Sequence, residues 1–159
     1  MLYASLKALH LIGVVVWVGG MFFMLMCLRP AAAEVLEPAP RVRLLHAALR
    51  RFFAWVSLAA LVVLASGATL IALAWRDRAG AGLPFNMPLD WYAMVAIFLV
   101  MLAVFAHVRL VLFRRVAQAV AAQAWPSGAK ALGAIRWEVA LNLVLGLFVI
   151  VMVRLGAAP

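Results

Sequence analysis

The sequence is poor in charge and almost free of cysteine, and both shortages narrow the classes of protein that it can encode. Charged residues make up 12% of the 159 residues, whereas hydrophobic residues make up 70%. A soluble domain of this size needs a more polar surface, so the composition predicts an integral membrane protein with no room for a separate soluble domain. The single cysteine, Cys27, excludes an internal disulfide, because that bond needs two thiols.

The sequence also lacks the motifs of hydrolytic and nucleotide-dependent chemistry. It contains no CxxC pair, no phosphate-binding loop, no paired carboxylates and no Ser-His-Asp set. Ser57, Ser66 and Thr69 are interpreted as small residues that allow helices to pack closely. We therefore predict no catalytic residue of the hydrolytic kind. The net charge of +9 does not indicate nucleic acid, because Lys and Arg gather in the loops of membrane proteins.

Four apolar segments are long enough to cross the hydrocarbon of a bilayer, which takes about 20 helical residues. They cover residues 2–28, 52–75, 91–113 and 137–154, and the first ends at Arg29-Pro30. The 15 residues between Glu138 and Arg154 span only about 22 Å as a helix, so we expect Glu138 to lie at the membrane end of the fourth segment. The sequence thus predicts an all-α, four-helix transmembrane bundle that forms one domain over residues 1–159.

The loops predict the orientation of this bundle. Residues 29–51 and 114–136 carry nine Lys and Arg residues, against four on the other side of the membrane. By the positive-inside rule, we expect both termini to lie outside the cytoplasm, which is the periplasmic side for a multi-pass protein of the bacterial inner membrane. Residues 41–51 are expected to form a basic helix leading into the second span, and residues 114–125 to continue the third helix. The cytoplasmic loops are expected to contact anionic lipids. Their basic residues are Arg29, Arg41, Arg43, Arg50, Arg51, Arg114, Arg115, Lys130 and Arg136.

A stripe of unusual residues follows one face of the first span. His10, Trp17, Met21 and Met24 share this face at helical spacing, while Cys27 points elsewhere. Imidazole and thioether groups suit copper, especially Cu(I). Methionine also fills gaps in apolar cores, and a methionine stripe alone indicates packing more often than metal binding. The histidine on the same stripe favours a site, because an imidazole in lipid is costly and usually faces a partner or a cavity.

Two histidines within the predicted spans lie at different depths. Aligning the ends of the spans places His10 near the level of Met101 and of Ser66, and places His107 near Glu138 and Asn142. The offset along the helix axes is on the order of 12 Å. This offset does not favour one haem that is bound by both histidines, because two axial ligands need similar depths.

Polar groups deeper in the bundle allow two interpretations. In one interpretation, His107 is a metal ligand and Glu138 fixes its tautomer. In the other, Glu138 forms a salt bridge that holds the third and fourth spans together. Asn142 shares a face with Glu138. Arg109 either extends toward the cytoplasmic interface or binds an anionic group such as a haem propionate.

Several short motifs resemble those of the bacterial copper-resistance D (CopD) family. They are Leu9-His10-Leu11, Trp17-Val18-Gly19-Gly20, Phe105-Ala106-His107 and the stretch from Trp125-Pro126 through Asn142 to Gly146. This family is implicated in moving copper across the inner membrane and in copper tolerance. The first span alone is also similar to that of the HemJ-type protoporphyrinogen oxidases, which are small haem b proteins.

Three functions follow from these observations. The leading hypothesis is copper handling, with copper entering near His10 and Met101 and passing Trp17, Met21 and Met24, and with His107 as a further ligand. The alternative is a haem b oxidoreductase with His10 or His107 as an axial ligand and Arg109 near the propionates. The third is a non-catalytic membrane scaffold whose histidines only join helices. A homodimer and a periplasmic donor of copper or electrons are the protein partners that these hypotheses allow.

Overall fold

The computed structural model describes residues 1–156, and helices account for nearly all of them. Four of the helices in this range are long and apolar enough to cross a membrane, which confirms an all-α, multi-pass membrane protein. The first consists of α1 (Leu2–Phe23), η1 (Met24–Leu28) and α2 (Arg29–Val35), and the second is α3 (Pro38–Gly80). The third consists of α4 (Leu89–His107), η2 (Val108–Leu112) and α5 (Phe113–Ala121), and the fourth is α6 (Trp125–Gly156). Residues 157–159 of the predicted domain lie outside the described residues.

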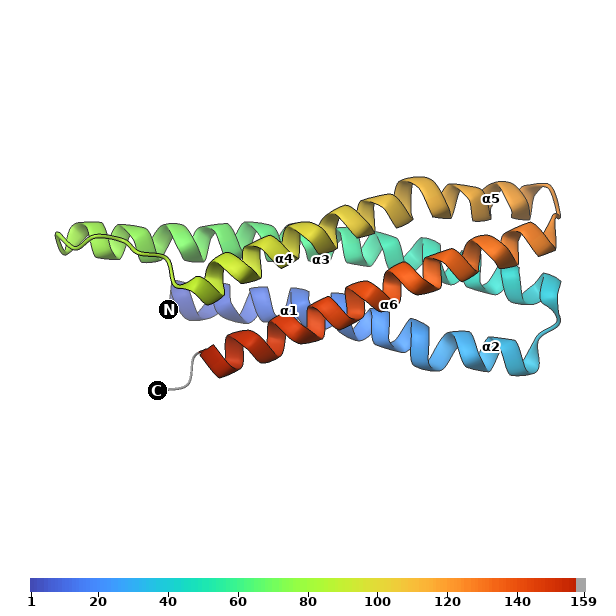
Figure 1. The fold of residues 1–159 in the computed structure, drawn as a ribbon, viewed down its shortest axis with the longest axis horizontal. Coiled ribbons are helices and arrows are strands. Elements are labelled where there is room, and N and C mark those ends of the chain that lie inside the picture. The colour runs from blue at the N-terminus through green and yellow to red at the C-terminus, as the bar shows by residue number, and fades with distance from the viewer. Residues whose placement is uncertain (157–159) are drawn as a thin grey trace.

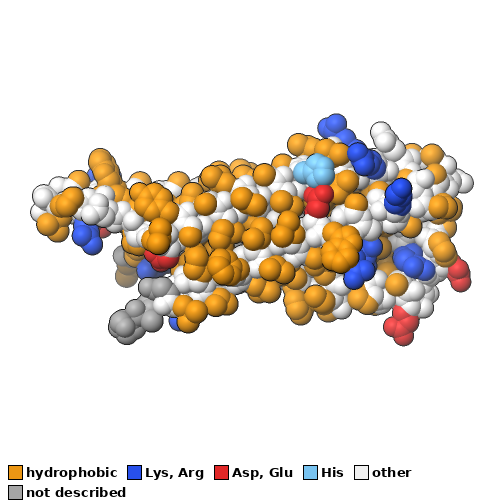
Figure 2. All heavy atoms as spheres, viewed as in Figure 1, with side chains coloured by type: hydrophobic (Ala, Val, Ile, Leu, Met, Phe, Trp, Pro, Cys, Tyr) orange, Lys and Arg blue, Asp and Glu red, His pale blue; other side chains and the backbone are white. Residues whose placement is uncertain are grey.

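The four helices run side by side along one long axis (Figure 1). Helix α1 packs along α3, and α6 packs along both α4 and α5. The start of α1 and the last turns of α6 lie at one end of the bundle, which we call the terminal end (residues 1–20, 63–101 and 142–156). The opposite end is the basic end (residues 29–51 and 109–138). Figure 2 shows apolar side chains along the length of the visible face and most of the visible Lys and Arg side chains over the half with α5.

The first helix is longer than the sequence predicts. Arg29-Pro30 does not end it, and the helix continues to Val35. A proline inside an α-helix lacks an N–H and clashes with the carbonyl four residues earlier. Here the wider π-turn η1 comes directly before α2, and the Arg29 N–H bonds to the carbonyl of Met24, five residues back. The helix therefore continues beyond the predicted end of the first span, because a π-turn lets the chain pass a proline without leaving the helix.

The two predicted extensions at the basic end are confirmed. Residues 41–51 belong to α3, which begins at Pro38, and α5 continues the third helix after the second π-turn, η2. The fourth helix begins at Trp125, ahead of the predicted span. The basic residues therefore lie mainly on helical extensions of the spans, so their positions are fixed by the bundle.

Aromatic rings close the middle of the bundle. The Trp17 ring lies edge-on to Phe98 and to Phe105, with centroids 5.9 Å apart in each pair. The fully buried Phe53 packs against Phe105 and Phe113. Edge-to-face rings of this kind pack tightly and leave little free space. This aromatic layer separates the terminal end from the basic end.

Candidate functional site

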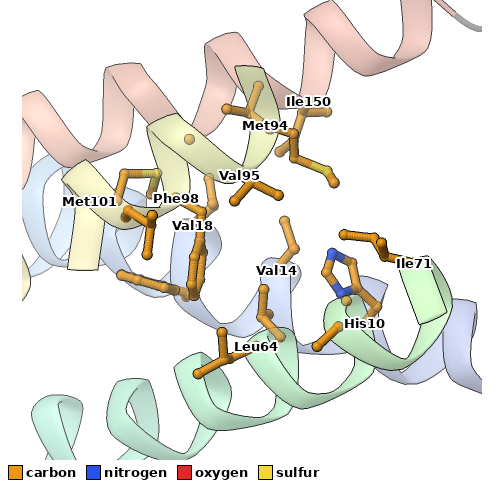
Figure 3. A pocket seen from close by; sticks show the side chains of 17 residues that line it. His10, Val14, Val18, Leu64, Ile71, Met94, Val95, Phe98, Met101 and Ile150 are labelled. Carbon is orange, nitrogen blue, oxygen red and sulfur yellow. The ribbon is translucent and has the colours of Figure 1, made fainter. Parts of the chain in front are cut away.

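The terminal half of the bundle contains an apolar cavity of about 200 Å³. It lies between the α1/α3 pair and the α4/α6 pair (Figure 3). Leu64 of α3 and Leu99 of α4 line it and are about half exposed, so the cavity reaches the apolar surface of the bundle. Of the described residues that line it, only His10 has a titratable side chain. The remaining lining residues are Val14, Trp17, Val18, Val63, Gly67, Ala68, Ile71, Met94, Val95, Phe98, Met101, Gly146, Val149 and Ile150.

The His10 imidazole is held by a hydrogen bond to the neighbouring helix. Its Nδ1 lies 3.0 Å from the Ser66 Oγ, and the Ser66 hydroxyl itself donates to the backbone carbonyl of Val62. A hydroxyl has one hydrogen, so the Ser66 oxygen accepts from His10, and Nδ1 carries the ring proton. The Nε2 lone pair is then free to bind a ligand, and Figure 3 shows the ring directed into the cavity. Sequence reasoning assigned Ser66 to packing and missed this role.

Two methionines of α4 line the same cavity. Met94 lies toward the His10 end, and Met101 lies deeper, beside Val18 (Figure 3). Met94 and Met101 are seven positions apart, which places them two turns apart on one face of the helix and about 10 Å apart along its axis. Met101 was predicted as a ligand from its depth, whereas Met94 was not predicted. Its spacing from Met101 was the sequence signal that could have identified it.

The other methionines of the predicted stripe lie elsewhere. Met21 is 2% exposed and belongs to the hydrophobic core rather than to the lining of the cavity. Met24 lines a second cavity of only about 20 Å³, together with Arg29 and Arg136. The structure thus places Trp17 at the large cavity but does not bring Met21 or Met24 to His10.

Gly19 and Gly20, which end the Trp17-Val18-Gly19-Gly20 motif, have different surroundings. A Cβ added at Gly20 would lie 2.7 Å from a ring carbon of Phe52, so Gly20 allows close packing of α1 on α3. A Cβ added at Gly19 would meet no other atom within 4 Å. Gly20 therefore supports the helix pair, whereas Gly19 lies at an open face.

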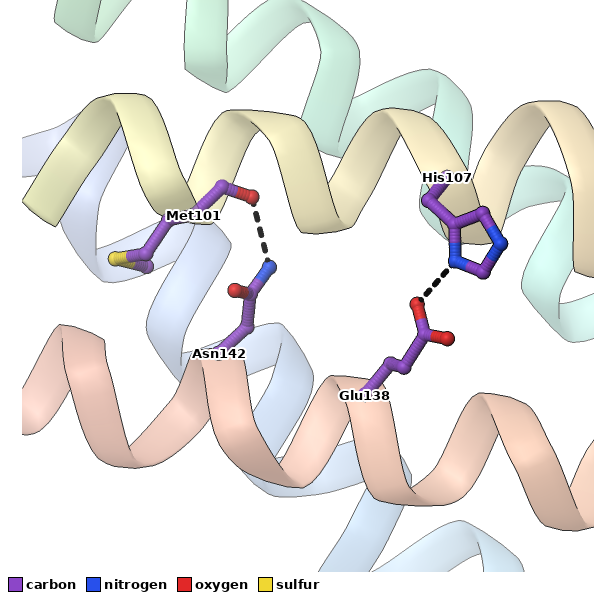
Figure 4. Close-up of polar contacts among 4 residues, drawn as sticks. All are labelled: Met101, His107, Glu138 and Asn142. Carbon is purple, nitrogen blue, oxygen red and sulfur yellow. Dashed lines mark hydrogen bonds and ion pairs between the residues drawn. The ribbon is translucent and has the colours of Figure 1, made fainter.

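His107 forms an ion-pair contact with Glu138 far from His10. Its Nδ1 lies 2.8 Å from Glu138 Oε2 and joins α4 to α6 (Figure 4). The side chains are 50% and 28% exposed, so the pair lies on the surface of the bundle. The predicted proximity of the two residues is confirmed, and so is their separation from His10, because neither lines the large cavity. Within residues 1–156, no cluster of three or more His, Cys, Asp or Glu side chains is arranged to hold a metal ion.

Asn142 forms a second link between α4 and α6. Its Nδ2 donates to the backbone carbonyl of Met101 at 3.0 Å (Figure 4), and the residue is 3% exposed. Its Oδ1 is buried and accepts no hydrogen bond from the part of the chain that the structure describes. Asn142 therefore fixes the backbone of Met101 at the deep end of the large cavity.

Arg109 does not line either cavity. Its guanidinium lies over the rings of Phe53 and Phe113, at 5.8 and 5.5 Å from their centroids. This arrangement places it at the basic end, away from His10.

The fold and the cavity define a helical, multi-pass membrane protein with one histidine in an apolar cavity. A family model described as "CopD: Copper resistance protein D" matches residues 46–155. This range is more than half of the chain, so the protein belongs to the CopD family. The matched range includes Ser66, Met94 and Met101 but begins after His10. Searches of curated proteins and of solved structures found no match.

Proposed function

We propose that this protein binds Cu(I) as cargo in the large cavity, with His10 and the methionines of α4 as ligands. Membership of the CopD family supports copper as the metal. The observation that carries the proposal is the His10 ring, whose Nδ1 is engaged by Ser66 so that Nε2 presents a lone pair to the cavity. Second-shell hydrogen bonds of this kind fix the tautomer and orientation of metal-binding histidines.

The available ligands fit a soft monovalent ion. Imidazole and thioether groups are neutral and favour Cu(I), whereas structural zinc sites are usually built from several Cys and His ligands. The cavity offers no such set among the described residues. His10 and Met94 would provide one binding position toward the terminal end of the cavity, and Met101 would provide another about 10 Å further along α4. Weak, soft ligands spaced along the cavity favour movement of the ion, because no single position binds it too tightly.

The proposed route continues toward the basic end. Beyond Met101 the ion meets the aromatic layer of Trp17, and then Met21 and Met24. Met21 is buried in the core, so passage requires the Trp17 ring to move. With both termini in the periplasm of a bacterial inner membrane, the cavity would receive copper from a periplasmic donor and the route would lead to the cytoplasm.

The size of this cavity favours a small ion over a haem. Pockets that bury drug-sized ligands have volumes of roughly 300–1,000 Å³. The cavity of about 200 Å³ is smaller, and His107 does not line it. The geometry therefore favours copper over haem b within one chain.

Cu(I) binding tests the proposal directly. Purified protein is titrated against a chromogenic Cu(I) chelator, and His10→Ala and the double variant Met94→Leu with Met101→Leu are compared with the wild type. We expect at least a tenfold loss of affinity in both. Met26→Leu is the matched control, because Met26 is 58% exposed and lies outside both cavities. Equal affinities in all four proteins would contradict the proposal.

A scaffold without copper is the second candidate, because each histidine within the spans joins two helices. His10 bonds to Ser66 of α3, and His107 bonds to Glu138 of α6. For His107, this interhelical role explains the geometry without a metal. If the wild-type protein binds no Cu(I) and His10→Gln changes only its thermal stability, the scaffold role is favoured.

A further inference from the structure

The basic end carries a large excess of positive charge. It holds ten of the 14 Lys and Arg residues, and its acidic residues are Glu34, Glu37 and Glu138. Some arginines bond within the chain, since Arg29 donates to the carbonyl of Leu132 at 2.7 Å and Arg41 donates to that of Leu36. These two arginines have acceptors within the chain, which distinguishes them from Arg109.

The Arg109 guanidinium is held in place by aromatic rings, but it has no hydrogen-bond acceptor among the described residues. It lies on η2, and the rings of Phe53 and Phe113 support its guanidinium. None of the described residues accepts a hydrogen bond or forms an ion pair with it. A guanidinium has five N–H donors in a fixed fork, and those donors need acceptors when they lie in a partly apolar environment.

The Phe113 ring also supports the imidazole of His46, which is a second hydrogen-bond donor. His46 stacks on Phe113 with centroids 5.1 Å apart and an angle of 17° between the rings. Arg50 follows His46 by one helical turn on the same face of α3. Phe113 thus contacts Arg109 from the third helix and His46 from α3, while Arg50 is placed near His46 by its spacing along α3. We call Arg109, His46 and Arg50 the Phe113 basic cluster.

The surroundings of the cluster indicate a ligand with both an anion and an apolar part. Leu110 and Val111 follow Arg109 directly and are exposed, with Leu110 at 55%. On the visible face, most of the Lys and Arg side chains lie among apolar side chains over the half of the bundle with α5 (Figure 2). Phospholipid headgroups lie beside such basic residues in a membrane, with acyl chains beside the apolar surface.

We propose that the Phe113 basic cluster binds the phosphodiester of one anionic phospholipid. The Arg109 fork contacts two phosphate oxygens, Arg50 supplies a second positive charge, and His46 donates an N–H. The lipid chains lie against Leu110 and Val111. This site is separate from the copper cavity and does not depend on the proposed function.

Lipid titration of the purified protein in detergent tests the site. Short-chain phosphatidylglycerol is titrated into the wild type, Arg109→Gln, Arg109→Lys and Arg154→Gln, with phosphatidylcholine and inorganic phosphate as separate ligands. Arg154→Gln removes one positive charge at the terminal end and is the matched control. We expect Arg109→Gln to bind phosphatidylglycerol at least tenfold more weakly, Arg109→Lys to lose part of the affinity, and Arg154→Gln to match the wild type.

The lipid titration can also overturn the proposal. Equal affinity of Arg109→Gln and the wild type would do so, as would an equal loss in Arg154→Gln. If inorganic phosphate binds as tightly as phosphatidylglycerol and depends equally on Arg109, the ligand is a free anion and the lipid assignment is wrong. Thermal unfolding of each variant separates loss of binding from loss of fold, and Arg109→Lys keeps the test valid if Arg109→Gln does not fold.

Discussion

The His10 Nδ1 and the Ser66 Oγ lie 3.0 Å apart and join α1 to α3 at the edge of the large cavity. Because the Ser66 hydroxyl is donated to Val62, this contact determines which His10 nitrogen carries a proton. The other ring nitrogen has a free lone pair and faces an apolar cavity that is also lined by two methionines. The proposed copper site depends on this single hydrogen bond.

Replacing Ser66 tests the role of that hydrogen bond. Ser66→Ala leaves the Nδ1–H of His10 without its acceptor, so the ring loses its fixed orientation. We expect a roughly 10–100-fold loss of Cu(I) affinity, as for other second-shell partners of metal ligands. Ser57→Ala is the control, because the Ser57 hydroxyl bonds only to the Phe53 carbonyl of its own helix. An affinity for Ser66→Ala equal to that of the control would show that the hydrogen bond does not orient a ligand.

A side chain at position 67 is expected to displace His10. A Cβ at Gly67 would lie 3.2 Å from His10 Cε1, and the branched side chain of Gly67→Val adds further atoms beside the ring. We therefore expect lower Cu(I) affinity in this variant. Gly19→Val provides the comparison, because a Cβ at Gly19 meets no atom within 4 Å. The expectation fails if both valine variants bind Cu(I) as the wild type does.

The His107–Glu138 pair is expected to contribute only modestly to stability. Both side chains are partly exposed, and solvent or headgroups screen such pairs, so a double-mutant cycle with His107→Gln and Glu138→Gln should give a coupling of about 1 kcal/mol or less. Unfolding in detergent measures it, and Cu(I) affinity should stay unchanged throughout the cycle. Loss of copper in either single variant would instead assign His107 to the metal site.

The Trp17 ring is expected to stabilise the bundle strongly. Trp17→Ala removes a buried ring that packs against Phe98 and Phe105, and such truncations cost about 3–5 kcal/mol. Trp137→Ala removes the same group at a position that is 73% exposed, so its effect should be much smaller. Chemical denaturation in detergent compares the two. Similar losses of stability in the two variants would contradict the assignment of Trp17 to the aromatic layer.

The features that could be predicted from the sequence depend on local patterns. Span positions follow from apolar length. The rise per residue places His10 at the depth of Ser66 and His107 at the depth of Glu138. Interactions between helices were harder to predict. The hydrogen bond from His10 to Ser66 depends on side-chain rotation, and the path past Pro30 depends on a π-turn that has no clear sequence signal. Met94 could not be identified as a lining residue because the sequence of the third helix does not define which of its faces meets the first helix.

The most direct test of the copper site is X-ray absorption at the copper edge of the Cu(I)-loaded protein. We expect ligation by imidazole nitrogen together with thioether sulfur in the wild type, loss of the nitrogen contribution in His10→Ala, and no change in Met26→Leu. A spectrum without sulfur ligands, or one that is the same in His10→Ala as in the wild type, would contradict the proposed copper site.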